Sequence, residues 1–249
     1  MTNRPAWPEA ARDLTAFRGR RDLGLHLNLT AGAPCGPMPR FAPRGAFPPI
    51  GEVVKQSLLR RLPVEEIRAE IARQIDGFAA EMGAPPDFVD GHQHVHILPG
   101  VRRWLIEDLA RRGWAGTVWL RDSSDQPAAI CARRVEAVKA LQVYALGRGF
   151  RQEAAQAGFA TNIGFSGFSS FDAGRSFATD FSAFLTRPGP RHLIMCHPGH
   201  PDAALAEIDD VSQTRSQELA FLMSDAFPAL MAAGHAILSC WNGSILTGP

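Results

Sequence analysis

One short stretch constrains this chain more than any other, and it reads Asp90-Gly91-His92-Gln93-His94-Val95-His96-Ile97-Leu98-Pro99-Gly100. Three of the eight histidines of the chain alternate with other residues here, directly after an aspartate. If the chain is extended from Phe88 onward, the two-residue period of a strand puts Asp90 and all three histidines on one face. The Pro-Gly pair then closes the strand in a loop, which is where α/β folds keep their chemistry. The pattern therefore favours a metal-binding or catalytic role over simple packing.

Length and composition narrow the class of protein. The 249 residues fit a single domain, residues 1–249, that is long enough for a full hydrophobic core. A formal charge of +1 gives no electrostatic reason to expect nucleic acid as a partner. The four cysteines form no CxxC pair, and the chain has neither a signal-peptide core nor a run of about 18 apolar residues. We therefore expect a reduced, cytoplasmic chain with no transmembrane segment and with small or neutral partners.

Hydrophobic periodicity predicts strands that alternate with helices. The predicted strands cover residues 22–30, 88 through the histidines, 117–120, 191–196 and 235–240. The predicted helices cover residues 5–17, 63–82, 101–112, 131–157, 177–186 and 214–232, and the predicted loops cover 31–51 and 161–172. This alternation predicts a parallel sheet, either open or closed into a barrel, and periodicity cannot choose between the two.

Three separate predicted strands lead to a histidine near their ends, namely His26, the run that begins at His92, and His197. A catalytic metal takes about three protein ligands and keeps a position open for water, and two imidazoles with a carboxylate are a common set. His26 and His92 are the best paired candidates, although spacing alone cannot choose His92 over His94. Such an ion lowers the pKa of its water towards ~7 and polarises a carbonyl, as hydrolysis of an amide or ester requires.

The other polar residues have supporting roles in this hypothesis. His197 lies on a different strand from the candidate ligands and is predicted to be the general acid; the alternative is a histidine that caps a Pro-Gly turn. Asp90 is predicted either to orient a ligating imidazole or to act as a catalytic base. His94 and His96 are predicted to contact the substrate or to support the metal ligands. Arg121, which follows the strand 117–120, is a further predicted substrate contact.

Three segments follow one another along the chain, and they are Gly24-Leu25-His26-Leu27-Asn28-Leu29-Thr30, Asp90-Gly91-His92-Gln93-His94-Val95-His96 and Met195-Cys196-His197-Pro198-Gly199. In order and spacing they resemble three motifs of the YdjC-like carbohydrate deacetylases, over nearly all of the chain. That family includes chitooligosaccharide deacetylases and hopanoid-biosynthesis deacetylases, and segment 161–172 is more similar to the hopanoid branch. The resemblance implies a distorted β/α barrel of the deacetylase type. It also implies a divalent metal, Mg²⁺ or Zn²⁺, on His26 and His92, with His197 as the acid.

The resemblance further implies a reaction, which is removal of the N-acetyl group from an acetylated amino sugar. The substrate would be a chitooligosaccharide or a glycolipid such as a hopanoid glycoside. The family normally begins with a strand that ends in Asp-Asp-Phe-Gly and supplies the third metal ligand and the base, and nothing in this chain matches it. We therefore expect a barrel without its first β/α unit, with weakened metal binding and little activity. The strand edges left open would be closed by the N-terminal segment, paired in a homo-oligomer, or left in an aggregation-prone monomer.

Two other interpretations stay open. One is a catalytically impaired remnant of the deacetylase fold that binds carbohydrate or metal. The other is an amidohydrolase-type metal hydrolase, because Asp-Gly-His-x-His followed by Pro-Gly is also similar to the first metal strand of that superfamily. Such enzymes need more ligand strands downstream, where this chain offers only His197 and His200, and His26 would then have no role.

Overall fold

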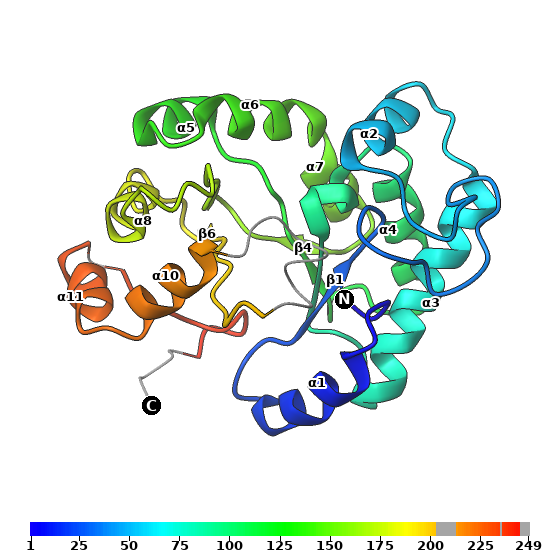
Figure 1. The fold of residues 1–249 in the computed structure, drawn as a ribbon, viewed down its shortest axis with the longest axis horizontal. Coiled ribbons are helices and arrows are strands. Elements are labelled where there is room, and N and C mark those ends of the chain that lie inside the picture. The colour runs from blue at the N-terminus through cyan, green and yellow to red at the C-terminus, as the bar shows by residue number, and fades with distance from the viewer. Residues whose placement is uncertain (203–212, 235, 245–249) are drawn as a thin grey trace. The chain divides into compact units, whose positions relative to one another are not determined.

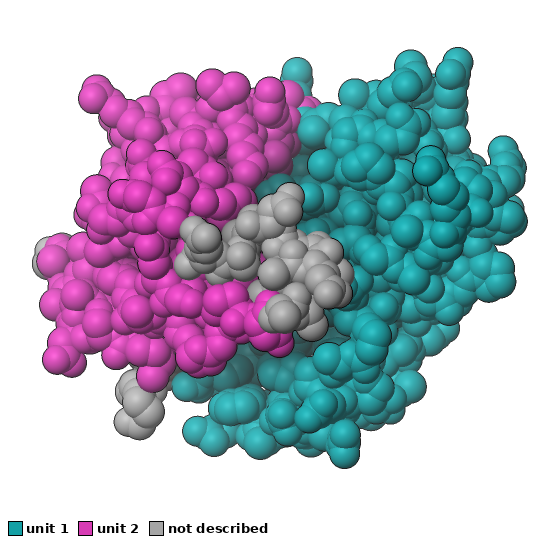
Figure 2. Space-filling view, in the orientation of Figure 1, with its two compact units in different colours: residues 1–122, 146–161 teal, residues 123–145, 162–249 magenta. Residues whose placement is uncertain are grey.

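The structure, a computed structural model, describes residues 1–202, 213–234 and 236–244. The chain divides into two compact units, of which unit 1 comprises residues 1–122 and 146–161, and unit 2 comprises residues 123–145 and 162–249 (Figure 2). Each unit contains its own parallel sheet. The parallel α/β class predicted from the sequence is therefore confirmed. The described strands form two separate sheets, so closure into a barrel is not confirmed.

Unit 1 contains a four-stranded parallel sheet in the order β1-β2-β3-β4. Its strands are β1 Gly24–Leu27, β2 Phe88–Gly91, β3 Trp119–Leu120 and β4 Ala160–Thr161. Leu25, Leu27 and Val89 are fully buried, as expected for parallel strands that are covered by helices. The register of β1 and β2 places His26 opposite Asp90, so the first two motifs meet at one end of this sheet.

The helices of unit 1 include one long amphipathic helix, α3. The set is α1 Trp7–Leu14, η1 Thr15–Phe17, α2 Ile50–Leu58, α3 Val64–Met82, η2 His92–Ile97, α4 Val101–Arg111 and α7 Phe150–Gln156, of which η1 and η2 are 3-10 helices. Helix α3 packs against α1, α4 and β1 (Figure 1). It begins after Pro63 and ends before Gly83, whose φ of 66° is left-handed, so the helix predicted over 63–82 is confirmed. Helix α2 was not predicted.

The strand predicted to continue through the histidines is wrong beyond Gly91. Strand β2 ends there, and the next six residues form η2. Gln93 and His94 have φ values of 48° and 61°, a left-handed backbone that turns the chain sharply. A Cβ on residue 91 would lie 2.8 Å from His96 Nδ1, so glycine is needed where η2 folds back onto β2. The three histidines therefore do not share one face of a strand.

Unit 2 combines a two-stranded parallel sheet with short helices. The elements are α5 Pro127–Arg133, α6 Ala137–Leu146, β5 Phe165–Ser166, α8 Phe177–Phe184, β6 Leu193–Ile194, α10 Gln213–Leu222 and α11 Ala226–Ala233; the last residue of α6 belongs to unit 1. Two aromatic clusters form its core, one around Phe165 and Phe168 and the other around Phe181, Phe184 and Phe221. Aromatic side chains thus supply much of the apolar contact of this unit.

Three sequence-based boundaries in the second half of the chain are corrected. The helical spacing of 131–157 is divided among α5, α6 and α7, because Arg134 (φ 58°) and Gly149 (φ 87°) are left-handed. The helix predicted over 214–232 is likewise two helices, α10 and α11. For the strand predicted over 235–240, residue 235 lies outside the described residues, and residues 236–240 form no strand of two or more residues.

Two observations bear on the surroundings of the chain. Within the described residues, the cysteines Cys35, Cys131, Cys196 and Cys240 form no disulfide. Within the part of the chain that the structure describes, no helix is long and apolar enough to cross a membrane.

Candidate functional site

The candidate site of unit 1 is built on the paired ends of β1 and β2. The Nδ1 atom of His26 lies 2.6 Å from Asp90 Oδ1, and because an ionised carboxylate can only accept, Nδ1–H is the donor. The side chain of His26 is 35% exposed, whereas that of Asp90 is 12% exposed. With its proton on Nδ1, His26 directs a lone pair from Nε2, which is the atom that can bind an ion or accept a proton.

Asp90 is held in turn by Arg121, which follows β3. Arg121 Nη1 lies 2.5 Å from Asp90 Oδ2, and Nη2 donates to the Gly91 carbonyl at 2.7 Å. Burial opposes the ionised form of Asp90, but the charges of Arg121 and His26 outweigh burial and hold the pKa of this carboxyl well below its usual range. Both carboxylate oxygens are engaged, which suits orientation of His26 better than proton transfer. A catalytic role for Asp90 stays a prediction.

The structure brings His92 beside His26. Their ring centroids are 5.6 Å apart and the ring planes meet at 73°, so an edge of one ring faces the other. His92 reaches this place from η2, at the end of β2, and not from the middle of a strand. His94 follows it in the left-handed turn and is partly buried, and its predicted contact with substrate stays a prediction.

His96 and Arg121, which were predicted to contact substrate, both point into the protein. His96 is fully buried, and its Nε2–H donates to the Arg121 carbonyl at 2.7 Å. Its ring stands edge-on to Phe150, with centroids 5.7 Å apart. Burial, followed by the charge of Arg121, lowers the pKa of His96 to about 3, so this imidazole is neutral. The described contacts of these two side chains are to protein groups next to Asp90, so they support the site from inside the protein. A direct contact of either side chain with substrate stays a prediction.

The donors at this site fit a divalent ion in kind but not in number. Two imidazoles from separate elements, one of them oriented by a carboxylate, match the usual surroundings of metal-binding histidines. A catalytic metal normally has about three protein ligands. In the described part of the chain, no group of three or more His, Cys, Asp or Glu side chains is placed to hold one ion. The site thus supplies two candidate ligands, His26 and His92.

His197 lies in unit 2, just after β6, and is described within that unit. Its backbone N–H donates to the carboxylate of Glu218 on α10, and its ring stands edge-on to Phe171 with centroids 5.4 Å apart. Burial raises the pKa of Glu218. Sequence patterns could not indicate this partner, because no spacing rule links a single glutamate in a helix to a histidine 21 residues away.

A second polar cluster in unit 2 resembles a Ser-His-Asp arrangement but has the wrong order of hydrogen bonds. Ser166 Oγ lies 2.8 Å from His192 Nε2, and Asp125 Oδ2 is 3.9 Å from His192 Nδ1. The Nδ1 atom instead accepts the Gly189 N–H at 3.2 Å, so the ring proton is on Nε2 and is donated to Ser166. The hydroxyl then donates to the Phe184 carbonyl at 3.2 Å. A general base needs its lone pair towards the serine, so this cluster is structural.

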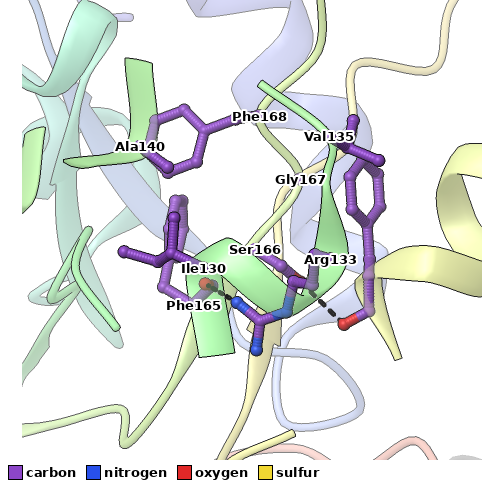
Figure 3. Close-up of a pocket in the computed structure, with 9 residues that line it drawn as sticks. Ile130, Arg133, Val135, Ala140, Phe165, Ser166, Gly167 and Phe168 are labelled. Atoms are coloured by element: carbon purple, nitrogen blue, oxygen red, sulfur yellow. Dashed lines mark hydrogen bonds between the residues drawn. The ribbon is translucent and has the colours of Figure 1, made fainter. Parts of the chain in front are cut away.

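Arg133 completes this cluster beside a small pocket of unit 2 (Figure 3). Its guanidinium donates to Asp125 Oδ2 at 2.6 Å and to the Phe165 carbonyl at 3.0 Å. Apolar side chains such as Ile130 and Phe168 line the rest of the pocket. Among the described residues that line this pocket, the polar side chains of Arg133 and Ser166 are both engaged in hydrogen bonds within the protein, so these residues offer no catalytic acid or base.

Sequence comparison decides the family. A family model described as YdjC-like protein matches residues 1–233. The chain belongs to the YdjC-like family. This match confirms the resemblance carried by the motifs around His26, His92 and His197.

Relatives of this YdjC-like chain have named activities. A carbohydrate deacetylase from Mus musculus is 35% identical over 130 residues, which are 45% of this chain and 41% of that protein. A chitooligosaccharide deacetylase from Proteus mirabilis strain HI4320 is 37% identical over 76 residues, which are 30% of this chain and 29% of that protein. The matched regions therefore span about two fifths or less of the length of these relatives.

A solved structure shares the fold. It is a crystal structure from Enterococcus faecalis V583 described as a candidate cellobiose-phosphate cleavage protein, with a TM-score of 0.69 and 20% sequence identity. The match covers 97% of this chain and 85% of that chain. At this identity it supports the parallel-sheet α/β fold and nothing further.

Proposed function

We propose that this chain provides the catalytic framework of a carbohydrate deacetylase that removes the acetyl group from an N-acetylated amino sugar. The family match over residues 1–233 and the relatives named carbohydrate deacetylase and chitooligosaccharide deacetylase support this proposal. The proposed substrate is a chitooligosaccharide, with an acetylated glycolipid of the hopanoid type as the alternative.

The observation that carries the proposal is the placement of His26 and His92 at adjoining strand ends, with Asp90 on the inner nitrogen of His26. This arrangement fixes the tautomer of His26 and leaves the lone pair on Nε2. In amide hydrolysis water adds to the acetyl carbonyl carbon, the C–N bond breaks, and the amine nitrogen gains a proton. His26 and His92 are proposed to act at the carbonyl end of that reaction.

We assign His26 and His92 to a divalent metal, and imidazole donors favour Zn²⁺ over Mg²⁺. When bound, such an ion supplies a Lewis acid for the acetyl carbonyl and lowers the pKa of its water. Asp90 would keep the lone pair of His26 on Nε2, and the buried Arg121 would keep Asp90 ionised. His197 is proposed to give its proton to the amine nitrogen as the C–N bond breaks.

One observation favours a second candidate function. The described residues contain no set of three metal ligands, which supports a protein that binds carbohydrate or metal without turning it over. Acetate release distinguishes the two candidates, because binding alone produces no acetate.

The test measures acetate release from N-acetylated chitooligosaccharides by the Zn²⁺-supplemented protein. His92→Ala should lower the zinc content found by elemental analysis. His197→Ala should lower turnover by about 10²-fold while zinc content is unchanged. The exposed neighbour His200 provides the matched control, and His200→Ala should leave both measurements unchanged. Sugar binding without acetate release would favour the second candidate, and equal turnover in His197→Ala would remove His197 from the reaction.

Two further expectations belong to this proposal. The described cysteines, which are not joined in disulfides, support a reducing compartment, and we propose a cytoplasmic location on that basis. Assembly into a homo-oligomer through open strand edges stays a prediction, which light scattering of the purified chain would test.

A further inference from the structure

A chain of contacts runs from the partly exposed His26 to the buried interior of unit 1. His26 Nδ1 meets one oxygen of Asp90, and Arg121 Nη1 meets the other. The second arm of the Arg121 guanidinium is fixed on the Gly91 carbonyl. The geometry points to Arg121 as a positioning residue. Its guanidinium determines whether residue 90 turns a hydrogen-bond acceptor or a donor towards His26, and thereby which nitrogen of His26 can take a ligand.

The Arg121 guanidinium has little freedom to move away from residue 90. The Arg121 side chain is 5% exposed, and its planar fork spans two acceptors on β2, a carboxylate and a backbone carbonyl. The backbone is fixed on both sides as well, since Arg121 N–H donates to the Val89 carbonyl at 3.1 Å and the Arg121 carbonyl accepts from His96. The donor that faces residue 90 is therefore held in place by four separate contacts.

This arrangement has a consequence for an amide at residue 90. The two oxygens of Asp90 are equivalent, so the aspartate satisfies Arg121 and His26 together. In Asp90→Asn the two ends differ. Arg121 can only donate, so it takes the amide oxygen and turns the amide NH₂ towards His26. His26 Nδ1 must then accept, which moves the ring proton to Nε2 and removes the lone pair from that nitrogen.

The inference rests on the proposed function only where it assigns a metal to His26 Nε2. The primary measurement therefore uses the metal-free protein, in which ¹⁵N chemical shifts of the His26 ring report the tautomer at a pH where the ring is neutral. We expect the Nδ1–H form in the native sequence and the Nε2–H form in Asp90→Asn. Zn²⁺ titration, the second measurement, should show about 10- to 100-fold weaker binding by Asp90→Asn.

The double variant Asp90→Asn/Arg121→Met isolates the role of arginine. Without a donor at residue 121 the amide is free to put its oxygen on His26, so the Nδ1–H form and part of the zinc affinity should return. The control is Arg102→Met, because Arg102 forms a similar pair with Glu153 in the same unit, with Nη2 to Oε1 at 2.5 Å. That control should leave the His26 tautomer and zinc binding unchanged.

The outcomes separate the inference from the proposed function. If the native His26 has its proton on Nε2, or if Asp90→Asn keeps the Nδ1–H form, Arg121 is not the positioning residue. If the double variant folds and retains the tautomer of Asp90→Asn, the arginine is likewise excluded. If the double variant does not fold, the tautomers of the native protein and of Asp90→Asn decide. If the tautomer switches as expected while no form binds zinc, the positioning role stands and the proposed metal is wrong.

Discussion

The cluster of His26, Asp90 and Arg121 in unit 1 and the cluster of His192, Asp125 and Arg133 in unit 2 contain the same three residue types. We refer to them as the site cluster and the buried cluster. In both, an arginine forms a short ion pair with the aspartate, at 2.5 Å in the site cluster and 2.6 Å in the buried cluster. In both, the same arginine also binds a backbone carbonyl. The two clusters differ at the histidine.

His26 hydrogen-bonds to its aspartate at 2.6 Å and is 35% exposed, whereas His192 is 3.9 Å from its aspartate and 7% exposed. Both ring nitrogens of His192 have partners within unit 2, Ser166 and the Gly189 N–H. His26 has one nitrogen on Asp90, its side chain is 35% exposed, and its ring centroid lies 5.6 Å from that of His92. Residue types alone therefore do not mark a functional site. The distinguishing features are the direction of the unused lone pair and its access to a ligand.

The largest expected effect is a loss of unfolding free energy when a cluster loses its buried arginine. The variant that tests this is Arg133→Met, in the buried cluster. Arg133→Met leaves the Asp125 carboxylate, which is 8% exposed, without its counter-ion. We expect the free energy of unfolding to fall by about 3–5 kcal/mol, measured by urea denaturation. The exposed pair of Arg103 and Glu107 is the control, and Arg103→Met should cost at most about 0.5 kcal/mol. A loss below about 1 kcal/mol in Arg133→Met would contradict a structural role for the buried cluster.

The two histidines should separate ligand binding from stability. His26→Ala should weaken Zn²⁺ binding by about 10²-fold, because it removes one of two candidate ligands, with little change in unfolding free energy. His192→Ala should lower the unfolding free energy by about 1–3 kcal/mol, because Ser166 and the Gly189 N–H lose their partner. Its zinc affinity should equal that of the native sequence. Calorimetric titration and urea denaturation of both variants check this. Weaker zinc binding in both variants would contradict the assignment of ligand binding to His26 and of a structural role to His192.

Lowering the pH should reduce the unfolding free energy through the two buried histidines, His192 and His96. Burial, followed by the charge of Arg133, lowers the pKa of His192 from 6.5 to about 4, and that of His96 falls to about 3. The unfolded chain therefore binds protons that the folded chain does not. The stabilisation is fully present above pH 6.5 and is lost as pH falls towards 4, by about 1 kcal/mol per pH unit for each histidine. His192→Gln should reduce the slope of unfolding free energy against pH in this window by about half, and an unchanged slope would contradict the assignment.

The smallest expected effect tests the resemblance of the buried cluster to a hydrolytic triad. Ser166→Ala removes a hydroxyl that accepts from His192 and donates to the Phe184 carbonyl. We expect a loss of about 1 kcal/mol in unfolding free energy and no change in acetate release. A fluorophosphonate probe should not label the native chain at Ser166. Labelling at this serine would show that the hydrogen-bond order inferred for His192 is wrong.

Sequence reasoning predicted the parts of this molecule that depend on local pattern. The repeat of Ile67, Ile71 and Ile75 predicted α3, because these side chains are fully buried on one helical face. The pairing of His26 with Asp90 depends instead on the parallel register of two strands that are 64 residues apart. No spacing in the sequence sets that register, so the contact was outside the reach of periodicity.

The His-rich stretch shows where the pattern misled. The alternating histidines indicate a strand only where the backbone stays extended, and Gln93 and His94 instead adopt left-handed φ values that the alternation does not reveal. The roles expected of His96 and Arg121 illustrate a second limit. Both are polar residues near a predicted site, and only the structure shows that their side chains are buried and directed to protein groups.

The position of β1 in its sheet has a consequence for dynamics. Among the described strands β1 stands at one end of the order β1-β2-β3-β4 and pairs with β2 alone, so opening that single ladder separates His26 from Asp90. Amide hydrogen exchange along Gly24–Leu27 therefore reports on the same opening that separates His26 from Asp90. A ligand that binds only the closed form slows this exchange in proportion to its saturation. Protection of the β1 amides that belong to this ladder can thus follow occupancy of the site without any chemical turnover.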